Sequence, residues 1–324
     1  MKAVVCRAYG PPQALVLEDI APPRPQAGEI VIHVHAAGVN FPDVLIVQGK
    51  YQFKPEPPFS PGAEVAGVVA AVGADVTEFA PGDRVAASML YGGYRGAVAV
   101  PAEAAHRVPD GVSFEVAAAA TLAYGTSYHA LQDRAALQPG ETLLVLGAAG
   151  GVGLAAVELG RLMGARVIAA ASSEEKLETC RRHGAESTVN YEREDVREAV
   201  KRLTDGRGVD VVYDPVGGKY SEPALRGMAW KGRHLVVGFA AGEIPRVPLN
   251  LTLLKGCAIV GVFWGQFARL EPAANRANLD RIMAWIAAGR LAPLVSKTYP
   301  LAQAADALDD MMNRRVQGKV VLRV

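Results

Sequence analysis

Features typical of secreted and membrane-spanning proteins are scarce in this chain of 324 residues. Its three cysteines, Cys6, Cys180 and Cys257, are too few and too scattered for a disulfide framework, so we interpret them as reduced thiols. The beginning of the sequence lacks the long apolar segment of a secretory signal, and no later stretch approaches the length of a membrane span. These absences predict a cytoplasmic protein that does not associate with membranes.

An excess of charge of one sign is also lacking. The 34 Lys and Arg residues nearly balance the 33 Asp and Glu residues, which gives a formal net charge of +1. Because no basic run or stripe is present, the chain offers little to attract DNA or an anionic membrane. Half of the residues are hydrophobic, and a chain of this length and composition can bury the cores of two domains.

The spacing of apolar residues divides the chain into segments of different type. Residues 1–123 hold short strand patterns broken by Pro and Gly, which predict a compact β domain. Residues 124–263 alternate strands with helices, which predicts a parallel sheet with helices on both faces. Residues 264–324, which contain a helix at about 275–288 and a final strand at 318–324, are expected to rejoin the first domain. In the middle segment we expect a helix at 195–204 and strands at 141–146, 166–171, 187–191, 209–214, 233–239 and 258–264.

A glycine-rich turn follows the first strand of the middle segment. The apolar run before it leads into Gly-Ala-Ala-Gly-Gly-Val-Gly at 147–153 and then into a helix pattern. Gly150 and Gly153 let the backbone turn tightly and let the helix lie close to the strand, so that free N–H groups at the helix N-terminus face a pyrophosphate. Any strand–turn–helix of an α/β protein could carry such glycines, but the strands on either side favour dinucleotide binding. The expected contacts are Ala149, Gly150, Gly151 and Val152.

The end of the second strand indicates which dinucleotide binds. Enzymes of this architecture that use NAD place an Asp or Glu there to hold the ribose hydroxyls. This chain has Ser172, Ser173 and Lys176 instead, which offer two hydroxyls and an ammonium to a 2′-phosphate that a carboxylate would repel. The serines could also cap the helix that begins at Glu174, and capping is compatible with a phosphate contact. We therefore expect NADPH rather than NADH as the cofactor.

A series of short motifs is spread over nearly the whole chain. They are Ala36–Asp43, Pro61–Gly67, Pro81–Val85, Ala148–Gly153, Val189–Tyr191 and Val211–Gly217. In this order and spacing they resemble the medium-chain dehydrogenase/reductase superfamily, and within it the zinc-free quinone oxidoreductase (zeta-crystallin-like) branch. The resemblance implies an α/β fold, with a GroES-like, β-rich catalytic domain at 1–123 and 264–324. The NADPH-binding domain at 124–263 is then expected to be a Rossmann domain with a doubly wound parallel sheet.

The resemblance also bears on zinc. Zinc alcohol dehydrogenases similar to this chain carry a Cys where Asn40 stands and a His where Ala63 stands, and a catalytic zinc needs three protein ligands. The lobe of four cysteines that holds structural zinc in those relatives is absent. Glu64 remains and is interpreted as a paired or strand-edge carboxylate, and His33 and His35 as surface or packing residues. We therefore expect no metal.

Without a metal to polarise an oxygen, the hydride acceptor has to be electrophilic already, as a quinone or an α,β-unsaturated carbonyl compound is. The protein then has to hold the nicotinamide against this small-molecule acceptor and to donate a hydrogen bond to the developing oxyanion. The resemblance places Asn40 beside the nicotinamide and Tyr51 at the border of the active site, so these two are the candidate catalytic residues. A second tyrosine position of the family holds Leu45, which makes the expected pocket more apolar. Asn40 could alternatively be a turn residue that tolerates positive φ after Gly38.

Further cofactor contacts are implied by the resemblance. Thr126 resembles a threonine that meets the nicotinamide or its phosphate side, and Tyr191 resembles a residue beside the adenosine 2′-phosphate. Lys319 resembles a basic residue near the cofactor, although it could equally be a solvated lysine at a strand end. The loops after the last two strands of the middle segment lie at strand C-terminal ends, where doubly wound sheets bind ligands. They contribute Gly238, Phe239, Phe263, Trp264 and Gly265, of which Phe263 and Trp264 could also belong to a domain interface.

The sequence thus predicts an NADPH-dependent reductase of quinones or enones. Two alternatives stay open, because zinc-free relatives include both: an enoyl-thioester (acyl-CoA) reductase, and a non-catalytic, NADPH-binding protein of the crystallin type with a structural or RNA-binding role. We also expect a homodimer. The strand at 258–263 is apolar, rich in β-branched residues and predicted at a sheet edge, where it can pair with its copy across a two-fold axis.

Overall fold

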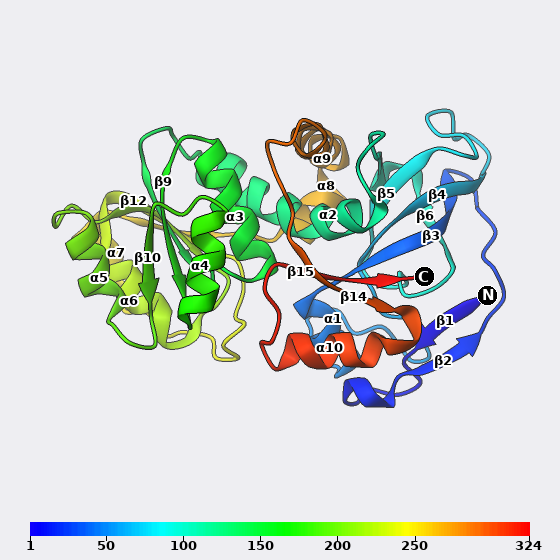
Figure 1. Ribbon diagram of the computed structural model, residues 1–324, viewed down its shortest axis with the longest axis horizontal. Coiled ribbons are helices and arrows are strands. Elements are labelled where there is room, and N and C mark those ends of the chain that lie inside the picture. Colours follow the sequence, from blue (N-terminus) through cyan, green and yellow to red (C-terminus); the bar gives the residue numbers. More distant parts are fainter. The chain divides into compact units, whose positions relative to one another are not determined.

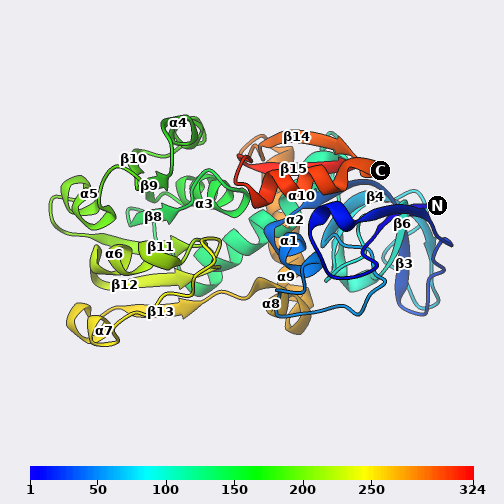
Figure 2. The same ribbon diagram turned by 90° about the horizontal axis from the view of Figure 1, so that it is seen from below.

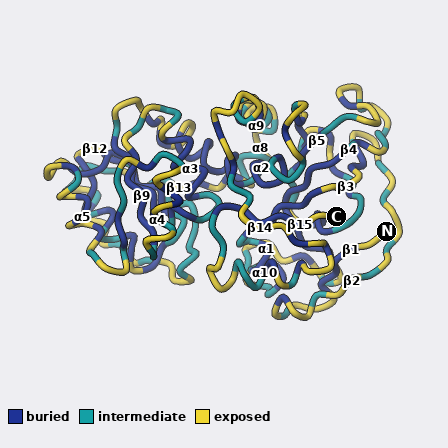
Figure 3. The backbone as a smooth tube through the Cα atoms, viewed as in Figure 1, coloured by how far each residue is buried: buried dark blue, intermediate teal, exposed yellow.

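The computed structural model describes all residues, 1–324, and the chain divides into two compact units. Unit 1 consists of Met1–Gly125 and Gly265–Val324, and unit 2 of Thr126–Trp264. Each unit has its own main β-sheet (Figure 1), and the central strands of both sheets are largely buried (Figure 3), whereas edge strands such as β13 and β14 are mostly exposed. None of the helices has the length and apolar character needed to cross a membrane.

Unit 1 is built on a mostly antiparallel sheet of seven strands. Its central strand, β3 (Glu29–Val39), is long enough to pair with three neighbours, and Val34 points into the core while His33 and His35 are exposed on the opposite face. His35 stacks on Phe114, so the two histidines are surface and packing residues as predicted. Around β3 lie β4 (Glu64–Val72), β5 (Arg84–Ser88), β6 (Ala97–Pro101), β7 (Ala105–Arg107), β14 (Val295–Pro300) and β15 (Lys319–Arg323).

The remaining elements of unit 1 cover this sheet and extend from it. A separate hairpin of β1 (Lys2–Val5) and β2 (Val16–Asp19) begins the chain. The helices are α1 (Phe41–Val47), α2 (Phe114–Tyr128), which continues into unit 2, α8 (Trp264–Leu270), α9 (Pro272–Ala287) and α10 (Ala304–Met312). Strand β15 pairs antiparallel with β3, with Val320 opposite Val39, so the C-terminal segment joins the same sheet as residues near the start of the chain.

Unit 2 is a doubly wound parallel sheet, as predicted. Its six strands have the order β10-β9-β8-β11-β12-β13, which Figure 2 shows in sequence across the sheet. Strands β8 and β11 are buried along their whole length because helices cover both faces. Figure 1 shows α3 and α4 on one face and α5, α6 and α7 on the other. The bounds are β8 Thr142–Leu146, α3 Gly151–Leu162, β9 Arg166–Ala171, α4 Glu174–Arg182, β10 Ser187–Asn190, α5 Val196–Leu203, β11 Val209–Asp214, α6 Ser221–Arg226, β12 Met228–Val236, α7 Asn250–Lys255 and β13 Ala258–Gly261.

Two predicted strand ranges in unit 2 were wrong. The strand expected at 233–239 begins at Met228 and ends at Val236, because its first half contains the polar pair Lys231-Gly232 and a bulge, with Lys231 at a φ of 64°. The strand expected at 258–264 ends at Gly261, and Trp264 begins helix α8. A short apolar run does not by itself distinguish a strand from a buried helix start.

Candidate functional site

The turn at the C-terminal end of β8 requires glycine at two positions, 147 and 153. Gly147 has a φ of 58°, which favours glycine. A Cβ on Gly153 would lie 2.3 Å from the Gly147 oxygen and 2.9 Å from the Ala148 Cα, so only glycine lets α3 approach the turn this closely. Gly150 caps α3, and the first turn of the helix leaves the N–H groups of residues such as Gly151 unpaired within the helix. This cradle fits a pyrophosphate.

The end of β9 brings three predicted cofactor contacts together. Ser173 caps α4, and its Oγ accepts a hydrogen bond from the Lys176 backbone N–H at 3.4 Å. The Lys176 Nζ lies 3.4 Å from the Ser172 Oγ, to which it donates. Capping therefore occupies only Ser173, and the Ser172 hydroxyl, which contacts the Lys176 ammonium, has no part in the cap. The donor set of two hydroxyls and one ammonium fits a dianionic phosphate better than a pair of ribose hydroxyls.

The other predicted cofactor contacts except Lys319 follow strands of the unit 2 sheet or lie on helices α2 and α8. Tyr191 follows β10 and packs its ring against Tyr220, with the centroids 4.5 Å apart. Gly238 and Phe239 follow β12, and Thr126 is buried on α2. Phe263 is exposed and Trp264 is buried, while Gly265 lies in the first turn of α8.

A buried carboxylate at the end of β11, Asp214, was not anticipated. Its oxygens accept hydrogen bonds from the backbone N–H groups of Val216 and Gly217, from the Ser221 hydroxyl at 2.5 Å and from the His234 ring at 3.2 Å. Burial alone would raise the pKa of Asp214, but these hydrogen bonds hold it below its ordinary value. The charged carboxylate thus fixes the loop that leaves β11.

In unit 1 the structure joins Asn40 and Lys319, which are far apart in the sequence. Asn40 is 6% exposed and Lys319 is 3% exposed. The Lys319 Nζ donates to the Asn40 Oδ1 at 2.5 Å, to the Glu64 Oε1 at 2.7 Å and to the Val39 carbonyl at 3.1 Å. The alternative that Lys319 is a solvated lysine was therefore wrong, because strand pairing of β15 with β3 places its side chain inside the unit.

Asn40 has no strained backbone. Its φ is −131°, so the alternative of a turn residue at positive φ was also wrong. The Asn40 Nδ2 donates to the Glu64 Oε1 at 2.8 Å, and the other Glu64 oxygen accepts from the Leu122 backbone N–H at 2.7 Å. Glu64 is thus a paired carboxylate, as predicted. We call Asn40, Glu64 and Lys319 the polar triad.

Another buried carboxylate, Asp43, lies beside the polar triad. Its Oδ2 accepts from the Asn40 backbone N–H at 2.8 Å and from the Tyr94 hydroxyl at 2.9 Å, while its Oδ1 is buried without a hydrogen-bond partner. Burial raises the pKa of Asp43 to about 7, although these hydrogen bonds and the charge of Lys319 oppose the shift. Tyr51 is half-buried nearby, and burial together with the charge of Asp43 raises the pKa of its phenol. Tyr51 therefore keeps its proton at neutral pH.

The donor atoms around the polar triad do not suit zinc. Zinc binds thiolate, imidazole or carboxylate groups, and a catalytic site supplies three of them. Asn40 offers an amide and Ala63 no donor atom, and both oxygens of Glu64 are already engaged by Lys319, Asn40 and Leu122. Nowhere in the chain do three or more His, Cys, Asp or Glu side chains converge in a manner that could hold a metal ion.

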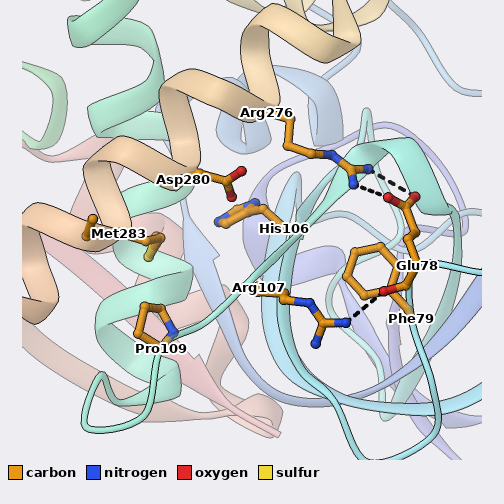
Figure 4. Close-up of a pocket in the computed structure, with 9 residues that line it drawn as sticks. Glu78, Phe79, His106, Arg107, Pro109, Arg276, Asp280 and Met283 are labelled. Carbon is orange, nitrogen blue, oxygen red and sulfur yellow. Dashed lines mark hydrogen bonds and ion pairs between the residues drawn. The ribbon is translucent and has the colours of Figure 1, made fainter.

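A cavity of about 400 Å³ lies elsewhere in unit 1, between β7 and α9 (Figure 4). Arg276 is paired with Glu78 on one side, and His106 and Asp280 line the other. His106 is buried and neither ring nitrogen has a hydrogen-bond partner, and burial followed by the charge of Arg276 lowers its pKa to about 4. None of the candidate site residues lines this cavity.

Comparison with known proteins places this architecture in a family. Residues 26–110 match the family described as alcohol dehydrogenase GroES-like domain, and residues 151–278 match the family described as zinc-binding dehydrogenase. A quinone oxidoreductase-like protein 2 homolog of Nematostella vectensis is 40% identical over 99% of this chain and 88% of its own length. A quinone oxidoreductase of Pseudomonas aeruginosa is 36% identical over 99% of both chains. The crystal structure of Escherichia coli quinone oxidoreductase complexed with NADPH superposes with a TM-score of 0.93 at 29% identity, over 100% of both chains.

The chain is therefore an oxidoreductase of the medium-chain dehydrogenase/reductase superfamily. Within that superfamily it belongs to the quinone oxidoreductase branch.

Proposed function

We propose that this oxidoreductase reduces quinones, or other electrophilic α,β-unsaturated carbonyl compounds, with NADPH and without zinc. The observation that carries the proposal is the polar triad, in which an amide, a carboxylate and an ammonium bind one another around Asn40, the position at which similar zinc enzymes carry a cysteine. Such a site supplies hydrogen bonds but no Lewis acid, so the acceptor has to be electrophilic by itself. NADPH, when bound, supplies the hydride, and with one proton from solvent a quinone becomes a hydroquinone.

The chain's own residues then bind the cofactor, orient it toward the acceptor and exclude water. The N–H groups at the start of α3 hold the pyrophosphate, and Ser172, Ser173 and Lys176 hold the 2′-phosphate. Asn40 and Tyr51 border the reacting end. The raised pKa of Tyr51 keeps its phenol protonated, so that it can donate a hydrogen bond to an oxygen that gains negative charge.

The proposal is tested by following NADPH consumption with benzoquinone, naphthoquinone and crotonyl-CoA. We expect turnover with the quinones, undiminished after dialysis against a metal chelator. Preferred turnover of crotonyl-CoA would establish the enoyl-thioester reductase instead. NADPH binding without turnover of any acceptor would favour a non-catalytic, crystallin-like role, and loss of activity on chelation that zinc restores would contradict zinc independence.

Cofactor choice is tested at Lys176. A hydrogen bond to a charged group contributes about 1.5–3 kcal/mol, so Lys176→Ala is expected to weaken NADPH binding about tenfold or more and to leave NADH binding nearly unchanged. Dissociation constants from fluorescence titration give both values. Lys201→Ala, at an exposed lysine of α5 in the same unit, is the matched control and should change neither. An equal loss of affinity for both cofactors in Lys176→Ala would show that Lys176 does not recognise the 2′-phosphate.

We further propose a homodimer that forms through β13. This strand lies at the edge of the unit 2 sheet with Ile259 41% exposed, and the nearby helix α7 exposes Leu253 and Leu254. An apolar sheet edge of this kind invites pairing with a second copy. Light scattering at micromolar concentration should give twice the chain mass for the wild type. The Ile259→Lys variant should have the mass of a single chain. Leu90→Lys, at an exposed leucine of unit 1, should leave the dimer intact, and a monomeric wild-type protein would refute the assignment.

A further inference from the structure

We propose that Lys319 is a positioning residue that polarises Asn40, so that a buried ammonium acts on the acceptor oxygen through one amide group. The inference rests on the proposed function for the location of the acceptor. It differs from the role expected for Lys319 in the sequence, which was direct contact with the cofactor.

The hydrogen bonds of Lys319 leave it nothing to offer a cofactor. An ammonium group has three N–H donors. Those of Lys319 are engaged by the Val39 carbonyl, the Asn40 Oδ1 and the Glu64 Oε1, at 3.1, 2.5 and 2.7 Å. A phosphate oxygen could be reached only by breaking one of these contacts inside a buried cluster, where an unpaired partner is costly.

The orientation of the Asn40 amide follows from the same contacts. Its oxygen faces the ammonium, and one N–H donates to Glu64 at 2.8 Å. The nearest acceptor for the second N–H is the Gly38 carbonyl at 3.5 Å, which is longer than a normal N–H···O bond. Asn40 therefore keeps one weakly engaged donor, and that is the group an oxyanion would use.

The charged hydrogen bond on the amide oxygen strengthens this donor. Hydrogen bonds in a chain polarise one another, and the effect is larger in a buried site of low effective dielectric. A cation on Oδ1 draws electron density from the amide nitrogen, so the remaining N–H becomes a better donor toward negative charge. The gain grows with the charge on the acceptor oxygen and is therefore larger in the transition state than in the bound quinone.

Glu64 fixes the Lys319 ammonium in place beside the Asn40 amide. Its carboxylate balances Lys319, and the Leu122 N–H holds its second oxygen. Gly38 makes room for this carboxylate, because a Cβ there would lie 2.3 Å from the Glu64 Oε1. The antiparallel pairing of β15 with β3 then holds the ammonium above Asn40. The position of the ammonium is thus set by buried, fixed elements.

The decisive experiment compares wild type, Lys319→Met and Lys319→Arg on a series of substituted quinones of falling reduction potential. We expect Lys319→Met to lower kcat about tenfold or more, to leave the KM for NADPH within about twofold, and to lose most with the least electrophilic quinones. Lys319→Arg, which keeps the cation, should recover part of kcat. A uniform loss across the series, with an unchanged slope against reduction potential, would mean that Lys319 is only structural.

A double-mutant cycle and a spectroscopic readout complete the test. Because Lys319 is proposed to act through Asn40, the loss in Asn40→Ala/Lys319→Met should equal that of Asn40→Ala alone, and additive losses would overturn the proposal. Lys319→Met/Glu64→Gln removes both charges and serves if the single variant does not fold. The side-chain amide signals of Asn40 in NMR should move upfield in Lys319→Met, whether or not quinones are substrates. Unchanged signals would refute the polarisation, whereas a wild-type enzyme inactive on all quinones would refute the proposed function alone.

Discussion

Gly153→Ala should destabilise unit 2 severely. The added Cβ would meet the Gly147 oxygen at 2.3 Å and the Ala148 Cα at 2.9 Å, and both are backbone atoms that cannot rotate away. Helix α3 would have to move away from β8, and the close packing over this fully buried strand would be lost. Overpacking of side chains costs about 1–3 kcal/mol, and a backbone clash is expected at or above the upper end of that range. The free energy of unfolding, from denaturant titration without cofactor, measures the effect.

Gly150→Ala is the matched control within the same turn. Gly150 has a φ of −78°, which any residue adopts, and its added Cβ would meet only the Gly147 oxygen at 3.4 Å. We expect a loss of about 1 kcal/mol or less in the free energy of unfolding. A methyl group at the mouth of the turn should nevertheless weaken NADPH binding if the pyrophosphate lies there. Equal stability of Gly153→Ala and wild type would show that the close approach is not needed for folding.

The contribution of Asp43 to stability should fall as pH rises toward neutrality, opposite in sign to that of His106, whose lowered pKa favours folding as pH rises. Asp43→Asn should remove the Asp43 contribution. Burial raises the pKa of this carboxyl from an unfolded value of 3.8 to about 7 in the folded chain. Between these values the unfolded chain releases the proton and the folded chain keeps it. The contribution of Asp43 to stability is therefore complete below about pH 4 and decreases by on the order of 1 kcal/mol per pH unit up to about pH 7.

The Asp43→Asn variant keeps the shape and the acceptor of this side chain. Its amide oxygen can still accept from the Asn40 N–H and the Tyr94 hydroxyl, and the amide nitrogen replaces the unpaired Oδ1. The free energy of unfolding of Asp43→Asn should increase relative to that of the wild type at each step from pH 5 to 6 to 7. The two values should therefore converge or cross. Asp110→Asn, at an exposed aspartate, should follow the wild-type profile. A constant difference between Asp43→Asn and wild type would mean that Asp43 is ionised throughout this range.

The parts of the fold that local patterns encode could be predicted from the sequence. Strand β9 begins and ends where the apolar run indicates, and helix α4 begins where the serine cap indicates, because both features are determined by residues close in the chain. Strand β12 was misplaced since Lys231 and Gly232 resemble a turn, and only pairing with β11 shows that they form a bulge.

The polar triad could not be predicted in the same way. Asn40 and Lys319 are separated by 279 positions, and a lysine at the start of an apolar strand resembles a solvated residue unless its partner is known. The signal that could have revealed the contact was the combination of Glu64 without zinc ligands and a single lysine in an otherwise buried strand. Whether these residues act on a nicotinamide cofactor and a quinone stays a prediction.

Unit 1 consists of two separate segments of the chain, and this affects the order in which the units can fold during synthesis. Unit 2 is a continuous segment, 126–264, whereas the sheet of unit 1 needs β14 and β15 from beyond it. During synthesis unit 2 can therefore fold before the sheet of unit 1 is complete. Until β15 emerges, Glu64 has no counter-ion for a position that the finished structure buries entirely, and the earlier strands of unit 1 present an open edge along β3. The nascent chain is thus most exposed to aggregation between the completion of unit 2 and the arrival of Lys319.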